Sequence, residues 1–136
     1  MSVIVTDAGF GPDDWTGDFA SLDEVREDGG RAVDLPSDTD PAALDTLPEG
    51  VEIVRVAFPS SADGRGFSLA RLLRLRGYSG RLRAAGHVIA DQYAMARRCG
   101  FDEVEIDDAL AARQPEDQWR FRAEWRVHDY QSRLRG

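Results

Sequence analysis

The chain has 136 residues, the usual length of a single domain and too short to hold two hydrophobic cores. Hydrophobic residues make up 42% of it and charged residues 31%, a globular composition that excludes a disordered chain. No stretch approaches the roughly 20 apolar residues that a membrane span requires. The N-terminal residues have no basic leader, so we expect one cytoplasmic domain, residues 1–136, without a signal peptide.

Cysteine and histidine usage limits the chemistry of the chain. Cys99 is the only cysteine, which excludes an internal disulfide, a cysteine zinc knuckle and a dithiol redox pair. The two histidines lie far apart in the sequence, and there is no Walker loop, GxGxxG fingerprint or HExxH pattern. We therefore expect no metal and no cofactor, and the sequence identifies no catalytic residue.

The net charge of −8 is unevenly distributed along the chain. Residues 1–64 contain three arginines and fifteen acidic residues, residues 65–98 contain eight arginines and one acidic residue, and residues 99–136 contain six arginines and nine acidic residues. There is no lysine at all. A GC-rich genome explains the missing lysine, but it does not explain why the positive charge is concentrated in the middle of the chain.

Short apolar runs alternate with helix patterns along the first half of the chain. Ser21, followed three residues later by Glu24, is typical of a capping box at a helix start. Asp40 before Pro41 predicts a second short helix, with aspartate at the N-cap and proline at the first helical position. In chain order we expect a strand at residues 3–5, a turn-rich loop, a helix at 21–27, a strand at 31–35 and a short helix from residue 40.

The patterns of the second half are clearer. Residues 51–58 are rich in β-branched side chains and end at Pro59, which predicts the central strand. Ser68 is expected to cap a helix whose leucines lie on one face. Further along we expect a strand at 81–85, a helix that opens after Gly86 and ends at Gly100, and a strand at 101–106. This alternation predicts an α/β fold, with a small, mostly parallel sheet of about five strands built from repeating βα units.

The C-terminal tail, residues 115–136, is rich in aromatic residues and has two interpretations. Apolar and charged residues alternate from Trp119 to Val127, which is typical of a strand, yet Trp119, Val127 and Tyr130 also fit one helical face. Pro115 followed by two acidic residues is a good helix start, so we slightly favour a helix. The aromatic side must be buried against the domain or against a second copy, and we expect a homodimer.

Ligands bind beyond the carboxyl ends of the strands in open α/β sheets. After the strand at 51–58 comes a loop in which Gly64 and Gly66 let backbone amides approach a ligand, and Arg65 offers a guanidinium fork. The segment after the next strand, ending in His87, is expected to open a helix beside this loop. We predict that the two segments form one site for a small oxyanion. Its candidate residues are Asp63, Gly64, Arg65, Gly66, Ser68, Arg83, Gly86, His87 and Asp91.

A purely structural interpretation of the same residues stands beside this one. The segment from Asp63 to Gly66 also fits a tight turn, and Ser68 fits a helix cap. His87 fits an ordinary position at a helix start, and Asp91 fits an ion-pair partner of an arginine. Both interpretations stay open at this point.

The arginines of the middle third also have two interpretations. They form either a solvated face balanced by the acidic N-terminal third or a docking surface for an acidic partner protein. Nucleic acid is disfavoured, because the pI is near 4.7 and no aromatic stacking platform is interleaved with these arginines. The candidate docking residues are Arg71, Arg74, Arg76, Arg97 and Arg98, with Arg81 in the same cluster.

Several segments in the middle of the chain together resemble the sequence pattern of a known family. They are Phe58–Ser60, Ala62–Arg74, Gly77–Tyr78, Leu82–Ala84, Asp91–Gln92 and Arg98–Asp102, with a fainter echo at Asp129–Gln131. As a set they resemble the bacterial domain of unknown function 934, over about residues 50 to 107. The chain departs from that family's pattern at Ser61, which is often phenylalanine there, and at His87, which is often aspartate.

The resemblance implies a role in assimilatory sulfur metabolism. Members of that family are usually described as oxidoreductases or as accessory proteins of sulfite reduction, and their genes tend to lie beside sulfite reductase. The implied function is that of an accessory protein whose arginines dock sulfite reductase or an acidic electron-transfer protein. The alternative is a small enzyme or sensor that binds sulfite, sulfate or a phosphorylated metabolite at the loop Asp63–Ser68. The residues themselves provide no redox centre.

Overall fold

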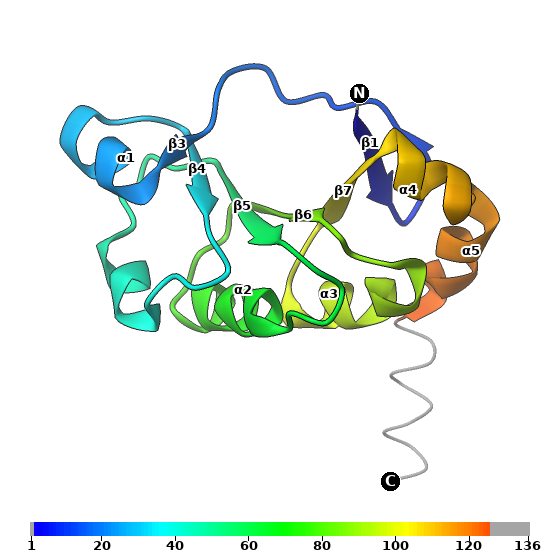
Figure 1. Ribbon diagram of the computed structural model, residues 1–136. Helices are drawn as coiled ribbons and strands as arrows, with labels where there is room; N and C mark the ends of the chain where they lie inside the picture. Colours follow the sequence, from blue (N-terminus) through cyan, green and yellow to red (C-terminus); the bar gives the residue numbers. More distant parts are fainter. Residues whose placement is uncertain (1, 126–136) are drawn as a thin grey trace, which may run out of the picture.

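Seven strands form one sheet in the computed structural model, which describes residues 2–125 (Figure 1). The strand order across the sheet is β2-β1-β7-β6-β5-β4-β3. Strands β3 to β7 run parallel to one another, whereas β1 is antiparallel to both β7 and β2. The bounds are β1 (Ser2–Thr6), β2 (Gly9–Gly11), β3 (Ala20–Ser21), β4 (Ala32–Leu35), β5 (Ile53–Phe58), β6 (Arg81–Gly86) and β7 (Glu103–Asp107).

The predicted α/β fold with a mostly parallel sheet is confirmed, but the sheet has seven strands rather than about five. Two strands that the sequence did not predict, β2 and β3, have three and two residues. Neither is long enough to show the period-two alternation by which a strand is recognised in a sequence. The prediction that β5 is the central strand is wrong by one position, because β6 lies in the middle of the seven.

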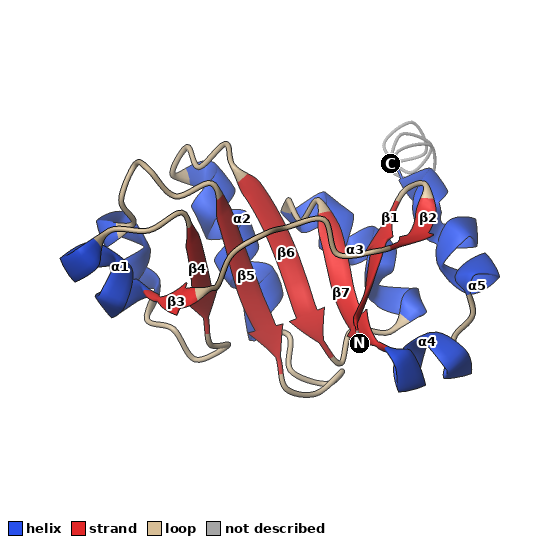
Figure 2. Cartoon of the chain, turned by 90° about the horizontal axis from the view of Figure 1, so that it is seen from above, coloured by secondary structure: helices blue, strands red, loops and turns tan. Residues whose placement is uncertain are grey.

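Helices and short 3₁₀ turns connect the strands. Figure 2 shows α2 and α3 on one side of the sheet, α1 at the end of the sheet that β3 forms, and α4 and α5 at the end where β1 and β2 lie. Within the described part of the chain, no helix is long and apolar enough to cross a membrane. The bounds are α1 (Leu22–Asp28), α2 (Arg65–Leu75), α3 (Tyr93–Cys99), α4 (Asp108–Arg113), α5 (Glu116–Phe121), η1 (Pro41–Thr46), η2 (Ala90–Gln92) and η3 (Arg122–Glu124).

The face of the sheet that α2 and α3 cover is apolar. Val56, Ala84 and Val104 lie in register on β5, β6 and β7, and all three are fully buried. Leu73 of α2 and Tyr93 of α3 belong to the same hydrophobic cluster. Removing one large apolar side chain from water contributes about 1.5–3 kcal/mol to stability, so this layer fixes both helices to the sheet.

Helix ends that depend on local contacts follow the sequence prediction. At the start of α1, Ser21 Oγ accepts a hydrogen bond of 3.2 Å from the backbone N–H of Glu24. At the start of η1, Asp40 Oδ1 accepts one of 3.0 Å from the N–H of Ala42. Gly100 ends α3 in the left-handed region, with φ of 113°, which glycine adopts without steric cost.

Two predicted helix starts are wrong. Helix α2 begins at Arg65 and not after Ser68, because Asp63 Oδ1 accepts a hydrogen bond of 3.1 Å from the N–H of Arg65 and turns the chain earlier. No helix opens at His87, because its N–H donates to the carbonyl of Phe58 at 2.9 Å. The chain therefore stays extended until η2 begins at Ala90.

The tail is helical as far as it is described, which agrees with the favoured interpretation. Pro115 is the N-cap of α5, and η3 ends at Glu124, so the part of the prediction beyond residue 125 lies outside the described residues. Trp119 is 1% exposed and meets the ring of Tyr93 edge-on, with 6.1 Å between centroids. This aromatic side chain is thus buried against its own domain, and the homodimer stays a prediction.

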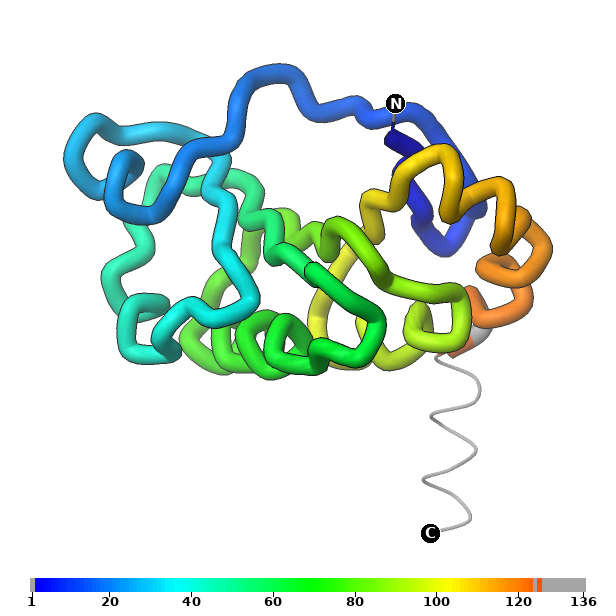
Figure 3. The backbone as a smooth tube through the Cα atoms, in the orientation of Figure 1, coloured from blue at the N-terminus to red at the C-terminus, as the bar shows by residue number. Residues whose placement is uncertain are grey.

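Residues 12–19 connect β2 at one edge of the sheet to β3 at the other edge. This connection, which we call the strap, crosses the face of the sheet opposite to α2 and α3 (Figure 3). The strap has no strand or helix of its own. The sheet therefore has two different faces, one covered by helices and one crossed by a single extended segment.

Candidate functional site

The segments that follow β5, β6 and β7 meet at the carboxyl end of the sheet and enclose a crevice of about 500 Å³. Crevices beyond the carboxyl ends of parallel strands are where open α/β folds bind ligands. The size is within the range of small-molecule sites, about 300–1,000 Å³. The crevice is lined by Pro59, Ser60, Ser61, His87, Ile89, Leu110, Arg113 and Gln114.

Gly86 sets how closely the first two segments approach each other. It pairs with Phe58 at the ends of β6 and β5, with φ of 119°. A Cβ at this position would lie 2.5 Å from the carbonyl oxygen of Phe58, closer than real Cβ contacts. Glycine is therefore required here by both the backbone conformation and the available space. The consequence is that His87 leaves the sheet directly beside the loop that begins at Pro59.

Two glutamine side chains join the walls of the crevice. Gln92 accepts a hydrogen bond from the N–H of Ile89 at 3.1 Å, and its Nε2 donates to the carbonyl of Ser61 at 2.7 Å. Gln114 Oε1 accepts from the N–H of Ala90 at 2.6 Å, which joins the end of α4 to the segment after β6. All three walls are thus held in place without a ligand, as a pre-organised binding site requires.

The crevice is electropositive in character. The ionisable side chains among its lining residues are His87 and Arg113, and the lining contains no carboxylate. Neither His87 nor Arg113 takes part in any ion pair within residues 2–125. The hydroxyls of Ser60 and Ser61 add two groups that can donate hydrogen bonds. Such a lining suits a ligand that carries an anionic group.

The predicted loop Asp63–Ser68 lies outside this crevice and is held by its own contacts. Arg65 forms a bidentate pair with Asp63, with Nε–Oδ1 and Nη2–Oδ2 distances of 3.0 and 2.8 Å, and also donates to Ser37 at 3.1 Å. The hydrogen bonds from Arg65 hold the pKa of Asp63 far below its ordinary value. The guanidinium fork of Arg65 already binds a carboxylate, which an external anion would have to displace. Anion binding at this loop stays a prediction.

Arg83 and Asp91, two other members of the predicted oxyanion site, are not gathered around the loop. Arg83 is completely buried on the opposite face of the sheet, where it pairs with Glu103 and Glu105. Asp91 pairs with Arg122. Gly64 caps α2, Gly66 packs under the ring of Phe58, and Ser68 lies within α2. Of the predicted set, His87 lines the crevice and Gly86 positions it, whereas Arg113, Gln92 and Gln114 were missed.

Three of the predicted docking arginines serve the fold. Arg74 donates to the carbonyls of Gly100, Tyr78 and Gly80 and pairs with Asp102 at 3.0 Å. Arg76 pairs with Asp45, with an Nε–Oδ1 distance of 2.5 Å. Arg97 pairs with Asp7 at 3.2 Å and lies over the ring of Trp125. Their charges are therefore largely neutralised within the molecule.

The other two docking candidates lie together on the surface. Arg71 of α2 and Arg98 of α3 are exposed, and the charges of both act on the thiol of Cys99. Two large apolar side chains of the same helices are exposed as well, Leu75 at 72% and Met95 at 51%. Burial raises the pKa of the Cys99 thiol, which argues against a reactive cysteine at this place.

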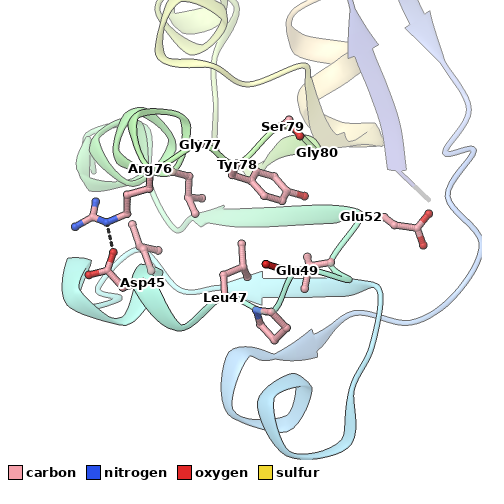
Figure 4. A pocket seen from close by; sticks show the side chains of 13 residues that line it. Asp45, Leu47, Glu49, Glu52, Arg76, Gly77, Tyr78, Ser79 and Gly80 are labelled. Carbon is pink, nitrogen blue, oxygen red and sulfur yellow. Dashed lines mark hydrogen bonds and ion pairs between the residues drawn. The ribbon is translucent and has the colours of Figure 1, made fainter.

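A second hollow, of about 660 Å³, lies at the amino ends of β5 and β6 (Figure 4). The buried side chains of Leu44, Val51 and Leu73 line it. Asp45, which is bound to Arg76, lines it as well (Figure 4). Three carboxylates line it against one arginine, so an anion is disfavoured here. These carboxylates do not form a metal site, since within residues 2–125 no group of three histidine, cysteine or acidic side chains that could hold a metal ion is found.

The fold is that of an open α/β protein, with a crevice lined by His87 and Arg113 at the carboxyl end of its sheet. The family model described as bacterial protein of unknown function (DUF934) matches residues 32–136. The chain therefore belongs to this family, as the segments in the middle of the sequence indicated. No curated protein and no solved structure matches it significantly. The matched region contains every residue of the crevice, whereas the strap lies outside it.

Proposed function

We propose that this protein binds a small ligand with an oxyanion group in the crevice at the carboxyl end of the sheet. The observation that carries this proposal is the placement of Arg113 and His87 in a cavity whose lining has no carboxylate. Most arginines of the middle third, by contrast, have carboxylate partners. A cation left without an intramolecular partner in a concave site is available to an anion from outside.

The lining has a polar part and an apolar part, so we expect a ligand with an oxyanion group and a small organic group. The guanidinium of Arg113 would bind the oxyanion through a bidentate fork, and His87, Ser60 and Ser61 would donate further hydrogen bonds. The crevice of about 500 Å³ is larger than one oxyanion requires, and its remaining walls are apolar, with Pro59, Ile89 and Leu110. A phosphorylated or sulfonated metabolite with a small organic part fits this division better than a free ion.

The family resemblance adds a chemical context to this site. It implies a role beside sulfite reductase, so sulfite and sulfate are the first oxyanions to examine, with phosphate as the comparison. A protein that holds a sulfur oxyanion without a redox centre would act as an accessory or sensor component of sulfite reduction.

Calorimetric titration of the full chain with sulfite, sulfate and phosphate tests this proposal. Arg113→Ala should weaken binding about tenfold or more, because a charge-assisted hydrogen bond contributes about 1.5–3 kcal/mol. Arg120→Ala is the matched control, since Arg120 is also an exposed arginine outside every ion pair of residues 2–125 but does not line the crevice. Binding that is absent, or equally strong in both variants, would refute the proposal.

A second candidate function rests on the exposed pair Arg71 and Arg98. Two cations beside exposed Leu75 and Met95 form a patch that an acidic protein with an apolar anchor would complement. Sulfite reductase or its acidic electron donor is the partner that the resemblance implies. A low-salt pull-down should recover that partner with the wild-type chain and lose it with Arg71→Glu, Arg98→Glu. Recovery that persists in the double variant, or at high salt, would contradict this role.

A further inference from the structure

The face of the sheet opposite to α2 and α3 carries charged side chains in adjacent positions on four parallel strands. We call it the charged face, and its members alternate along each strand with the residues of the apolar core. It contains an unusual number of buried charges, since Arg83 is 0% and Glu103 is 4% exposed. The charged face consists of Asp34, Arg55, Arg81, Arg83, Glu103 and Glu105.

Within the sheet these charges are balanced. Arg55 forms a bidentate pair with Asp34, at 2.6 and 2.8 Å, and approaches Glu105 at 3.3 Å. Arg83 binds Glu105 at 2.8 Å and Glu103 at 2.6 Å. Three arginines thus face three sheet carboxylates, and the charged face by itself has no net charge.

The strap adds carboxylates to this balanced set. Asp13 binds the Nη1 and Nη2 atoms of Arg83 with both oxygens, at 3.1 and 3.0 Å, and Asp14 pairs with Arg81. The ring of Phe19, at the end of the strap, lies 3.9 Å from the guanidinium carbon of Arg55, a cation–π contact. The strap therefore presents an acidic and an aromatic side chain to two arginines, as an acidic peptide ligand would.

The strap is attached by side chains alone. Within residues 2–125, no backbone–backbone hydrogen bond involves residues 12–19. Strap residues line two hollows, of about 680 and 460 Å³, one together with Arg55 and the other together with Arg81. The indole Nε1 of Trp15 is buried and has no hydrogen-bond partner in the described part of the chain, which disfavours the attached state. A segment with so few backbone constraints belongs to the least stable parts of a fold.

The family match separates the two partners of this contact. The charged face lies within the matched residues 32–136, whereas the strap lies outside them. The arginines are thus part of the family domain, and the carboxylate that fills the fork of Arg83 comes from outside it.

We infer that the charged face is a binding surface for an acidic segment of a partner protein, and that the strap occupies this surface in the free molecule. Arg83 would bind a carboxylate of the partner through the fork that Asp13 fills, and Arg55 would hold an aromatic ring in the place of Phe19. The partner segment displaces the strap. The exchange leaves the net charge at Arg83 unchanged, because one carboxylate replaces another. This inference concerns a different face from the crevice, so it does not depend on the proposed function.

A peptide with the sequence of residues 11–20, GPDDWTGDFA, is the natural probe, because the strap itself defines what the surface accepts. Its binding is measured by fluorescence anisotropy to the full chain and to the full-chain variant Asp13→Asn, Asp14→Asn. In the wild-type chain the attached strap competes, which lowers the apparent affinity by the fraction of open molecules. The open variant should therefore bind the peptide about tenfold more tightly or better.

Two controls make the outcome decisive. The chain variant Asp18→Asn removes a strap carboxylate that forms no ion pair within the described residues, and it should bind as weakly as the wild type. The peptide with both of its first two aspartates changed to asparagine should not bind the open variant. If the open variant keeps its circular dichroism and does not bind the peptide, or if the wild type binds equally well, the inference is wrong. If the double variant does not fold, the single variant Asp13→Asn is tested against the same criterion.

Discussion

The side-chain oxygen of Gln114 accepts a hydrogen bond of 2.6 Å from the backbone N–H of Ala90. This contact joins α4 to the segment after β6, two parts of the chain that are 24 residues apart. Ala90 is buried, with 1% exposure, so water does not readily replace the lost partner. One wall of the crevice is therefore held by a glutamine side chain that itself lines the crevice.

Gln114→Ala should destabilise the protein by about 1–3 kcal/mol, the cost of leaving a buried N–H without an acceptor. The free energy of unfolding is measured by urea denaturation. Gln118→Ala is the matched control, since Gln118 is an exposed glutamine on α5 whose side chain has no hydrogen bond in the described structure. Its effect should stay within about 0.5 kcal/mol. Equal effects of the two changes would contradict the role given to Gln114.

Gly86→Ala should destabilise the protein and should also lower its affinity for any ligand of the crevice. The new Cβ would lie 2.5 Å from the carbonyl of Phe58, at a φ of 119° that L-residues rarely adopt. Strain of this kind costs about 1–3 kcal/mol, and more where the backbone must move. Gly64→Ala is the control, because nothing lies within 4 Å of its added Cβ and its φ is −88°. Thermal unfolding of both variants compares them, and a drop in Tm for Gly64→Ala of the same size would exclude this explanation.

The parts of the fold that were predicted from the sequence are those specified by local contacts. The capping pair Ser21 and Glu24, the Asp40 cap and the Gly100 stop each act within a few residues, so the sequence order alone identifies them. The strands β2 and β3 were not predicted, because strands of two or three residues exist only through their pairing with distant segments. The start of α2 was misplaced for another reason, since the sequence predicts Ser68 as its cap, whereas Asp63 accepts a hydrogen bond from the N–H of Arg65 and turns the chain earlier.

The candidate site was predicted only in part. His87 was found because it follows a recognisable strand, whereas Arg113 follows β7 by way of α4, which the sequence analysis did not predict. A local signal for α4 exists, since Asp107 Oδ1 accepts a hydrogen bond of 2.7 Å from the N–H of Leu110. The pairing of Arg83 with Glu105 left no local signal, because the two residues belong to different strands.

Arg83→Met should be strongly destabilising, by about 3–5 kcal/mol, because it leaves the buried carboxylate of Glu103 with only one of its two arginine partners. Adding Glu103→Leu should recover part of this loss, so the double variant should be more stable than the sum of the single changes predicts. Arg71→Met is the control on an exposed helix surface and should change stability by about 0.5 kcal/mol or less. Urea denaturation of the wild type, Arg83→Met, Glu103→Leu and the double variant completes the cycle, and strict additivity would show that the two side chains do not interact.

The attachment of the strap should depend on pH through Asp13. Its hydrogen bonds with Arg83 lower its pKa below the ordinary value of 3.8, against a smaller opposing effect of burial. A carboxylate with a lowered pKa stabilises the attached state above its ordinary pKa, and this contribution is lost as the pH falls through the lowered value. The NMR resonances of residues 12–19 should therefore move toward their random-coil positions as the pH falls below about 4. In Asp13→Asn these resonances should lie near random-coil positions at every pH, while Asp18→Asn should follow the wild type. Strap resonances of Asp13→Asn that match those of the wild type at neutral pH would mean that this carboxylate does not hold the strap.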